Sequence, residues 1–222
     1  MLRFFKKKKY PAFWQKHIDT IKNCKNYSVY ENIRFVALDT ETTGFNYDND
    51  RILCIGAVAL KNGKILVDDS LEVYVKQDVF NKETVKIHGI RRNGNELKVS
   101  EEEALIQFVE FIDDAILIAH HTIFDMTMIN EALKRLGLGP IRSKQLDTNF
   151  IHKKITPIDW FKKTFTLDDL CEIYNVKKHD RHTALGDALI TAILFLKLTH
   201  KYKKNNILNL TDLIKTNYYL KL

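Results

Sequence analysis

The hydrophobic and polar positions along this chain alternate in blocks that predict a mixed α/β domain. Short apolar runs rich in β-branched and aromatic residues are typical of buried strands. The predicted strands are residues 33–39, 51–60, 65–76, 115–119 and 145–150. Asn62 and Gly63 separate the second and third runs, and this pair is a strong signal for a tight hairpin. The first three strands should therefore form an antiparallel meander.

Apolar residues at helical spacing predict helices between and after these strands. Ser100 and Thr166 each open a capping-box sequence, with an acidic residue three positions later, and so mark two helix starts. The expected helices lie within residues 81–96, start at residue 100, and cover residues 122–136, 166–174 and 183–203, whereas residues 152–163 are expected to be irregular and basic. This order predicts a mixed five-stranded sheet, three antiparallel strands plus two parallel ones, with helices on both faces.

The two ends of the chain differ from the segment between them. Residues 1–28 begin with the basic run from Lys6 to Lys9 and continue with apolar residues at helical spacing. Residues 204–222 are weakly amphipathic. We therefore expect a basic, helical N-terminal extension over residues 1–28, a central domain over residues 29–203, and a C-terminal tail over residues 204–222.

Composition narrows the range of partners and the location. The net charge is +7 and the pI is about 9.1, which favours a polyanionic partner. The three cysteines are scattered and form neither a metal-ligand spacing nor a disulfide framework, so a reducing cytoplasm is the expected location. No apolar run approaches the roughly 18 residues of a membrane span, and the basic N-terminus precedes no signal-peptide core.

The first candidate for chemistry is the pair of carboxylates at the end of the first predicted strand. Side chains along a strand alternate with a period of two, so Asp39 and Glu41 should point to the same side. Two ionised carboxylates in that position repel each other, so they need a cation or one of them must take up a proton. Oxygen ligands of this kind suit Mg²⁺ or Mn²⁺. The plainer interpretation is that both are polar residues where a strand meets a turn.

Two further acids and a histidine lie at predicted helix starts. Asp125 follows Thr122 by three residues, and the simplest role of this pair is a capping box. Asp187 falls in the first turn of the last long helix, where an acid is stabilising in any case. His182 precedes Asp187 by five residues, so the two would differ by about 140° on one helix. His182 should therefore lie in the preceding loop.

Taken together, these positions indicate a catalytic site. Strand ends and helix starts gather at one edge of an α/β sheet, where ligands bind. Four converging carboxylates with two divalent ions make a site for in-line phosphoryl displacement. A histidine whose pKa is close to neutral is a suitable general base for the attacking water.

With these residues the chain resembles the DEDDh 3′→5′ exonucleases, the family that includes the proofreading epsilon subunit of bacterial DNA polymerase III. Residues 39–44 match the first family motif, Asp-x-Glu-Thr-Thr-Gly, in full. The other two motifs, His-Asn-x-x-Phe-Asp and His-x-Ala-x-x-Asp, are matched at His120, Phe124, Asp125, His182, Ala184 and Asp187. His121 stands where the family usually has Asn. The resemblance covers about residues 31–200 and implies a ribonuclease H-like exonuclease domain over residues 29–203.

The resemblance also implies the roles of the site residues. The catalytic metal ligands would be Asp39, Glu41, Asp125 and Asp187, which would hold two divalent cations, Mg²⁺ or Mn²⁺. His182 would deprotonate the attacking water, and the product would be a 5′-mononucleotide. The implied substrate-binding residues are Thr42, Thr43, His88, Ile90, His120 and Phe124.

The leading expectation is a metal-dependent 3′→5′ exonuclease that acts on single-stranded or frayed 3′ ends of DNA in proofreading or repair. An exonuclease of the same fold that trims RNA or oligonucleotides is an alternative, because a few pocket atoms decide whether the 2′-hydroxyl is accepted. A non-catalytic polymerase accessory subunit is a third alternative, but it predicts the loss of an acid or of the histidine, and none is lost. The C-terminal tail could contact a DNA polymerase subunit or a second copy of this chain, and no membrane partner is expected.

Overall fold

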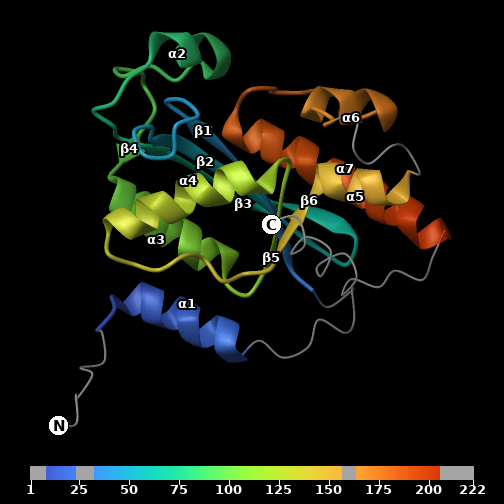
Figure 1. The fold of residues 1–222 in the computed structure, drawn as a ribbon, viewed down its shortest axis with the longest axis horizontal. Helices are drawn as coiled ribbons and strands as arrows, with labels where there is room; N and C mark the ends of the chain where they lie inside the picture. The colour runs from blue at the N-terminus through green and yellow to red at the C-terminus, as the bar shows by residue number, and fades with distance from the viewer. Residues whose placement is uncertain (1–8, 24–32, 157–163, 206–222) are drawn as a thin grey trace.

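A computed structural model describes residues 9–23, 33–156 and 164–205 of the chain (Figure 1). Its centre is a six-stranded sheet in the order β4-β3-β2-β1-β5-β6. The strands are β1 (Phe35–Thr42), β2 (Ile52–Lys61), β3 (Lys64–Val75), β4 (Lys98–Val99), β5 (Ile116–Ala119) and β6 (Gln145–Asp147). The first three pair antiparallel, β5 runs parallel to β1, and β6 runs parallel to β5.

The mixed α/β sheet predicted from the sequence is confirmed, with one short strand added at its edge. β4 has only two residues and pairs parallel with Tyr74 and Val75 of β3. It lies in a polar segment, so the hydrophobic pattern gave no signal for it. The strand predicted over residues 145–150 is shorter than expected, because it ends at Asp147.

The helices of the described residues are α1 (Ala12–Asn23), α2 (Lys82–His88), α3 (Glu101–Ile112), α4 (Thr122–Arg135), α5 (Thr148–Ile155), α6 (Leu167–Ile173) and α7 (Ala184–Asn205). α5 corrects the prediction, which placed a strand up to residue 150 and an irregular segment from residue 152. Asp147 starts this helix, because its Oδ1 accepts a hydrogen bond from the Phe150 backbone N–H at 3.1 Å. Ile151 is then buried in one cluster with Phe195 of α7, and this contact favours the helix over an extended chain.

Alternation along β1 divides the core into two layers. Val36 and Leu38 pack into the cluster formed with α3 and α4, whereas Phe35 and Ala37 pack into the cluster formed with α7. The sheet therefore lies between α3 and α4 on one face and α7 on the other, with α5 and α6 beside α7 (Figure 1). By the same period of two, Thr40 should face α4, while Asp39 and Glu41 should face α7.

Gly56 allows the start of α7 to approach the sheet closely. This residue pairs with Asp39 across the β1–β2 ladder. A Cβ atom at Gly56 would lie 2.1 Å from the carbonyl carbon of Ala184 and 2.2 Å from the backbone nitrogen of Leu185. Only glycine therefore permits this contact, which brings the first turn of α7 next to the acidic end of β1.

Helix α1 confirms the helix predicted in the N-terminal extension. Trp14 is 2% exposed and belongs to the cluster that contains α3 and α4. Residues 1–8 with their basic run, residues 24–32 and the tail from residue 206 lie outside the described residues, so the division of the chain at residues 28 and 204 stays a prediction. Among the helices that the structure describes, none is long and apolar enough to cross a membrane.

Candidate active site

Three carboxylates meet where the carboxyl end of β1 lies beside the first turn of α7. Asp39 and Glu41 come from alternate positions of β1, and Asp187 comes from α7. One oxygen of each carboxylate lies within 4.8 Å of the corresponding oxygens of the other two. The sequence prediction that these three acids converge is therefore confirmed, and their spacing is that of a site for a cation.

Asp125 reaches the same strand from the opposite face of the sheet. Its Oδ1 accepts hydrogen bonds from the Thr40 backbone N–H at 2.9 Å and from Thr40 Oγ1 at 2.7 Å. The structure excludes the plainer alternative of a capping box for Asp125: His121 is the N-cap residue of α4, in a left-handed conformation with φ 61°, and it makes no side-chain cap. Thr122 donates its backbone N–H to Asp147 at 2.8 Å instead. Asp125 is thus free of a capping role.

The carboxylates of the cluster are too close together and too buried to be ionised at the same time without added positive charge. Burial raises the pKa of Asp39 well above its ordinary value, and the neighbouring carboxylates of Asp125, Asp187 and Glu41 raise it further. Burial, followed by repulsion from Asp187 and Asp125, raises the pKa of Glu41 to about 8. Burial also raises the pKa of Asp125 to about 7, although its hydrogen bonds from Thr40 oppose this shift. Ionising all of these acids together is therefore unfavourable without added positive charge.

Arg181 supplies part of that charge, and the sequence interpretation did not identify it. Its Nη1 donates to Oδ2 of Asp187, and its Nε donates to Oδ1 of Asp168 at 3.1 Å. The remaining oxygen of Asp187, Oδ1, is buried and has no hydrogen-bond partner within the described residues. This unpaired oxygen, facing a cluster of oxygen donors, fits a divalent metal ion, for which carboxylates are the preferred ligands. The sequence signal for Arg181 was its place beside His182 in a short polar loop.

His182 lies in the loop before α7, as its spacing from Asp187 predicts. It has a left-handed backbone with φ 66°, and its side chain is exposed. Its backbone N–H lies 3.3 Å from Oδ2 of Asp187, and its Nδ1 lies 3.3 Å from Nη1 of Arg181. The backbone of His182 is thus tied to Asp187 of α7, while its imidazole remains accessible to solvent.

The two threonines after Glu41 hold the turn that follows β1. Oγ1 of Thr42 donates to the carbonyl of Gly44 at 2.8 Å, and Oγ1 of Thr43 donates to Asp50 at 2.7 Å. The Thr43 carbonyl accepts a hydrogen bond from the Asn81 side chain at 3.1 Å. Both threonine side chains are therefore committed to the turn, and a substrate contact would be made by the backbone.

The remaining expected substrate residues flank the cluster. His88 is buried and its Nδ1 accepts the backbone N–H of Ile90 at 3.0 Å. Ile90 packs in one cluster with Ala184, the first residue of α7. His120 lies at the end of β5, where its Nδ1 is 2.9 Å from Oγ1 of Thr148, and burial lowers its pKa to about 3. His120 is therefore neutral.

Phe124 is the centre of an aromatic group that the sequence interpretation recognised only in part. Its ring centroid lies 5.6 Å from that of Phe45 and 5.8 Å from that of Tyr47. Phe45 is 78% exposed, which is unusual for a large apolar side chain. The only sequence signal was the presence of two aromatic residues directly after the Asp-x-Glu-Thr-Thr-Gly motif. The group therefore presents exposed aromatic surface, built from residues that follow the first acidic motif and from the residue before Asp125.

Comparisons with known proteins agree with this geometry. The family model described as Exonuclease matches residues 36–195, which is more than half of the chain. The DNA polymerase III PolC-type of Caldanaerobacter subterraneus subsp. tengcongensis is 34% identical over 180 residues, which cover 81% of this chain and 12% of that protein. The chain therefore spans only a small part of the length of this curated relative.

Two solved structures have the same fold. Escherichia coli Exonuclease I in complex with a dT13 oligonucleotide has a TM-score of 0.67 and 16% identity, covering 78% of this chain and 42% of that one. Exonuclease X in complex with 5′ overhanging duplex DNA has a TM-score of 0.61 and 19% identity, covering 82% of this chain and 98% of that one. With the family match over residues 36–195 and the convergence of Asp39, Glu41 and Asp187, the chain belongs to the exonuclease family.

Proposed function

We propose that this protein removes nucleotides one at a time from single-stranded or frayed 3′ ends of DNA and releases 5′-mononucleotides. The observation that carries the proposal is the cluster of Asp39, Glu41 and Asp187, with Asp125 held beside it by Thr40. These four carboxylates would hold two divalent ions, Mg²⁺ or Mn²⁺. Such ions activate water and neutralise the charge that develops on the phosphate.

The side chains of the protein divide the remaining work. His182 takes the proton of the attacking water, because its imidazole is solvent-accessible and is tied through its backbone to Asp187. Arg181 and Thr40 position Asp187 and Asp125. The backbone of Thr42 and Thr43, together with Phe124 and Ile90, receives the terminal nucleotide, and the neutral His88 and His120 line that pocket without adding charge.

DNA is the substrate that the comparisons favour. Both structural neighbours are described in complex with DNA, and the curated relative is a DNA polymerase. The net charge of +7 includes the acids of the site, so the rest of the surface is still more basic and suits a polyanion. We therefore infer a proofreading or repair role in the cytoplasm beside a DNA polymerase subunit, with a second copy of the chain as the other candidate partner.

A matched substrate panel tests this function. Labelled single-stranded DNA, a duplex with a mismatched 3′ end, single-stranded RNA and a DNA dinucleotide are each incubated with Mg²⁺ or Mn²⁺. The proposal predicts stepwise shortening from the 3′ end, faster on the mismatched than on the matched duplex, and slower on RNA. Shortening from the 5′ end or internal cutting would contradict it, and faster digestion of RNA would favour the RNA-trimming alternative.

A further inference from the structure

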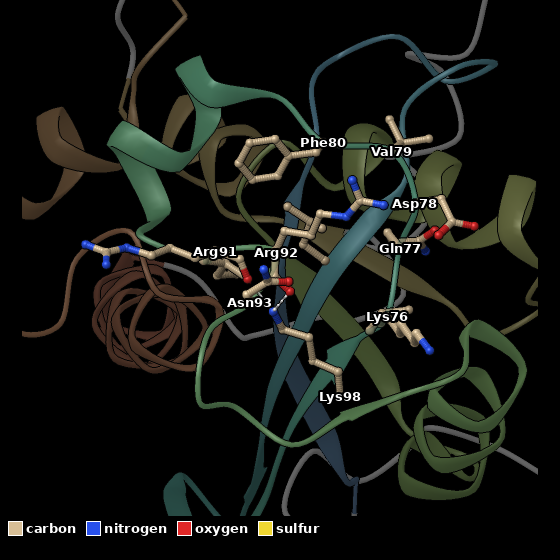
Figure 2. Close-up of a pocket in the computed structure, with 12 residues that line it drawn as sticks. Lys76, Gln77, Asp78, Val79, Phe80, Arg91, Arg92, Asn93 and Lys98 are labelled. Atoms are coloured by element: carbon tan, nitrogen blue, oxygen red, sulfur yellow. Dashed lines mark hydrogen bonds between the residues drawn. The ribbon is translucent and has the colours of Figure 1, made fainter.

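A small pocket lies outside the carboxylate cluster, at the C-terminal end of β3. It is lined by the segment after β3 and by the loop after α2, including Lys76, Phe80, Ile90, Arg91 and Arg92 (Figure 2). Its volume is about 140 Å³. Pockets that enclose a whole small molecule hold roughly 300–1,000 Å³, so this pocket is suited to one part of a longer ligand.

The pocket is positively charged, and most of its basic side chains have no ion-pair partner among the described residues. The side chains of Lys76, Arg91 and Arg92 are exposed, and within the described residues they make no ion pair or side-chain hydrogen bond. Lys98 is used differently, because its Nζ donates to the carbonyls of Arg91 and Arg92 and so fixes the loop that carries both arginines. The two arginine side chains point in different directions (Figure 2). Diverging guanidinium groups suit successive phosphates of a strand better than a single anion.

An aromatic ring accompanies these cations. Phe80 lies beside the arginines in Figure 2 and is 41% exposed. Cationic side chains next to an exposed ring are the combination with which proteins bind single-stranded nucleic acid, through phosphate contacts and base stacking. The pocket carries one acid of its own, Asp78, against several basic side chains.

The pocket is connected to the carboxylate cluster by packing and hydrogen bonds. Ile90 lines it and also packs with Cys54, which pairs with Glu41 across the β1–β2 ladder. The segment carrying Phe80 is tied to the turn after β1, because Asn81 donates to the Thr43 carbonyl. A strand whose 3′ end enters the cluster therefore has this pocket within reach.

We propose that this pocket is a second subsite for the substrate strand, which binds the phosphates and one base of single-stranded DNA upstream of the terminal nucleotide. The proposal rests on the proposed exonuclease function. Arg91 and Arg92 would contact the phosphates, and Phe80 would stack on the base. A dinucleotide is too short to occupy both sites, so the subsite should matter only for longer strands.

Binding of fluorescein-labelled dT12 to the full chain in EDTA tests the subsite, with fluorescence anisotropy measured over a range of salt concentrations. The double variant R91A/R92A should weaken binding at least tenfold at low salt and reduce the slope of log affinity against log salt by about 1.4, since each lost phosphate contact contributes about 0.7. Phe80→Leu should weaken binding about fivefold or more with the salt slope unchanged, and Phe80→Tyr should restore it.

The control variant also removes two positive charges, but at the opposite end of β3, where β2 and β3 form their hairpin. Lys61 and Lys64 pair at the hairpin between β2 and β3, and K61A/K64A should change affinity by less than about twofold. If R91A/R92A behaves like this control, the proposal of a subsite is wrong.

Activity in the presence of Mg²⁺ provides a second test. R91A/R92A should lower kcat/KM on dT12 but not on a dinucleotide, and equal losses on both substrates would also overturn the proposal of a subsite. A wild type that cuts neither substrate would refute the exonuclease function, while the EDTA binding series would still decide the subsite.

Discussion

Two of the four acids, Asp125 and Asp187, are each held by a neighbouring side chain outside the acidic cluster. Thr40 faces α4 because it alternates with Asp39 and Glu41, and it therefore reaches Asp125 on the other side of the sheet. Arg181 holds one oxygen of Asp187 and leaves the other unpaired. The geometry of the cluster thus follows from strand alternation and from one arginine.

His182→Ala is expected to reduce turnover about 10²–10⁴-fold with substrate binding nearly unchanged. The reason is that in the proposed mechanism the imidazole acts on the attacking water, while the four acids proposed to hold metal remain. Single-turnover rates on single-stranded DNA, measured across pH 6 to 9, provide the test. A variant that works at the wild-type rate over this range would remove His182 from the mechanism.

His121→Asn is the matched control for that experiment. His121 has φ 61° and ψ 48°, a left-handed conformation that both His and Asn adopt more readily than most residues. The substitution restores the residue usual in the family and leaves the acids and His182 in place. Activity should remain within an order of magnitude of the wild type.

The motifs in the sequence were sufficient to predict that Asp39, Glu41 and Asp187 converge and that His182 lies in the loop before α7, because short motifs carry both residue type and spacing. They could not predict Arg181 or Phe45, since contacts between a loop and distant residues depend on tertiary structure. The plainer alternative for Asp125, a helix cap, fails for the same reason: a capping sequence is local, whereas the hydrogen bonds of Asp125 come from Thr40 on β1.

At the scale of elements, the approach of α7 to the sheet positions Asp187. Gly56→Ala should push the first turn of α7 away from β2, because the new Cβ would lie within 2.1–2.3 Å of backbone atoms there. We expect a loss of about 1–3 kcal/mol in the free energy of unfolding and at least tenfold weaker Mg²⁺ binding. Urea denaturation in EDTA and calorimetric Mg²⁺ titration measure the two effects.

Gly139→Ala provides the comparison, since among the described residues a Cβ there has only Trp14 within 4 Å, at 4.0 Å, and Gly139 has no positive φ. It should leave both stability and Mg²⁺ affinity nearly unchanged. Unaltered Mg²⁺ binding in Gly56→Ala would mean that the position of α7 does not control the metal site.

Periodicity predicted the order and type of most elements but not α5 or β4. α5 is an amphipathic helix of eight residues that follows directly on β6, and its helical state depends on the Asp147 cap and on packing against α7. β4 is defined only by its pairing with β3. Both depend on partners far away in the sequence, which local patterns do not reveal.

At the scale of the whole molecule, the acids make the stability of the metal-free protein depend on pH. The folded-state pKa values of Glu41, about 8, and Asp125, about 7, lie above those of unfolded carboxyls. The folded protein therefore holds protons that the unfolded chain releases, and stability falls as pH rises through these values. Buried histidines such as His120 have lowered pKa values and act in the opposite sense, but only below about pH 6.5.

In EDTA, the melting temperature should therefore decrease between pH 6.5 and 8.5, and Glu41→Gln should flatten this decrease. Mg²⁺ binds the ionised carboxylates, so its stabilising effect should grow over the same interval. Thermal unfolding followed by circular dichroism, with and without Mg²⁺, gives both quantities. A metal-free melting temperature that rises across this interval would contradict the assigned pKa shifts.

The most direct test of the account is the digestion of 5′-labelled dT12 by the wild type, by Asp39→Asn and by Glu131→Gln at saturating Mn²⁺. Glu131 is the control acid, since it pairs with Lys134 on the exposed side of α4. If the carboxylate cluster is the catalytic metal site, the wild type and Glu131→Gln should give a ladder shortened from the 3′ end that EDTA abolishes, and Asp39→Asn should give no digestion. Digestion by Asp39→Asn at a rate near that of the wild type would contradict the assignment of the carboxylate cluster as the metal-dependent catalytic site.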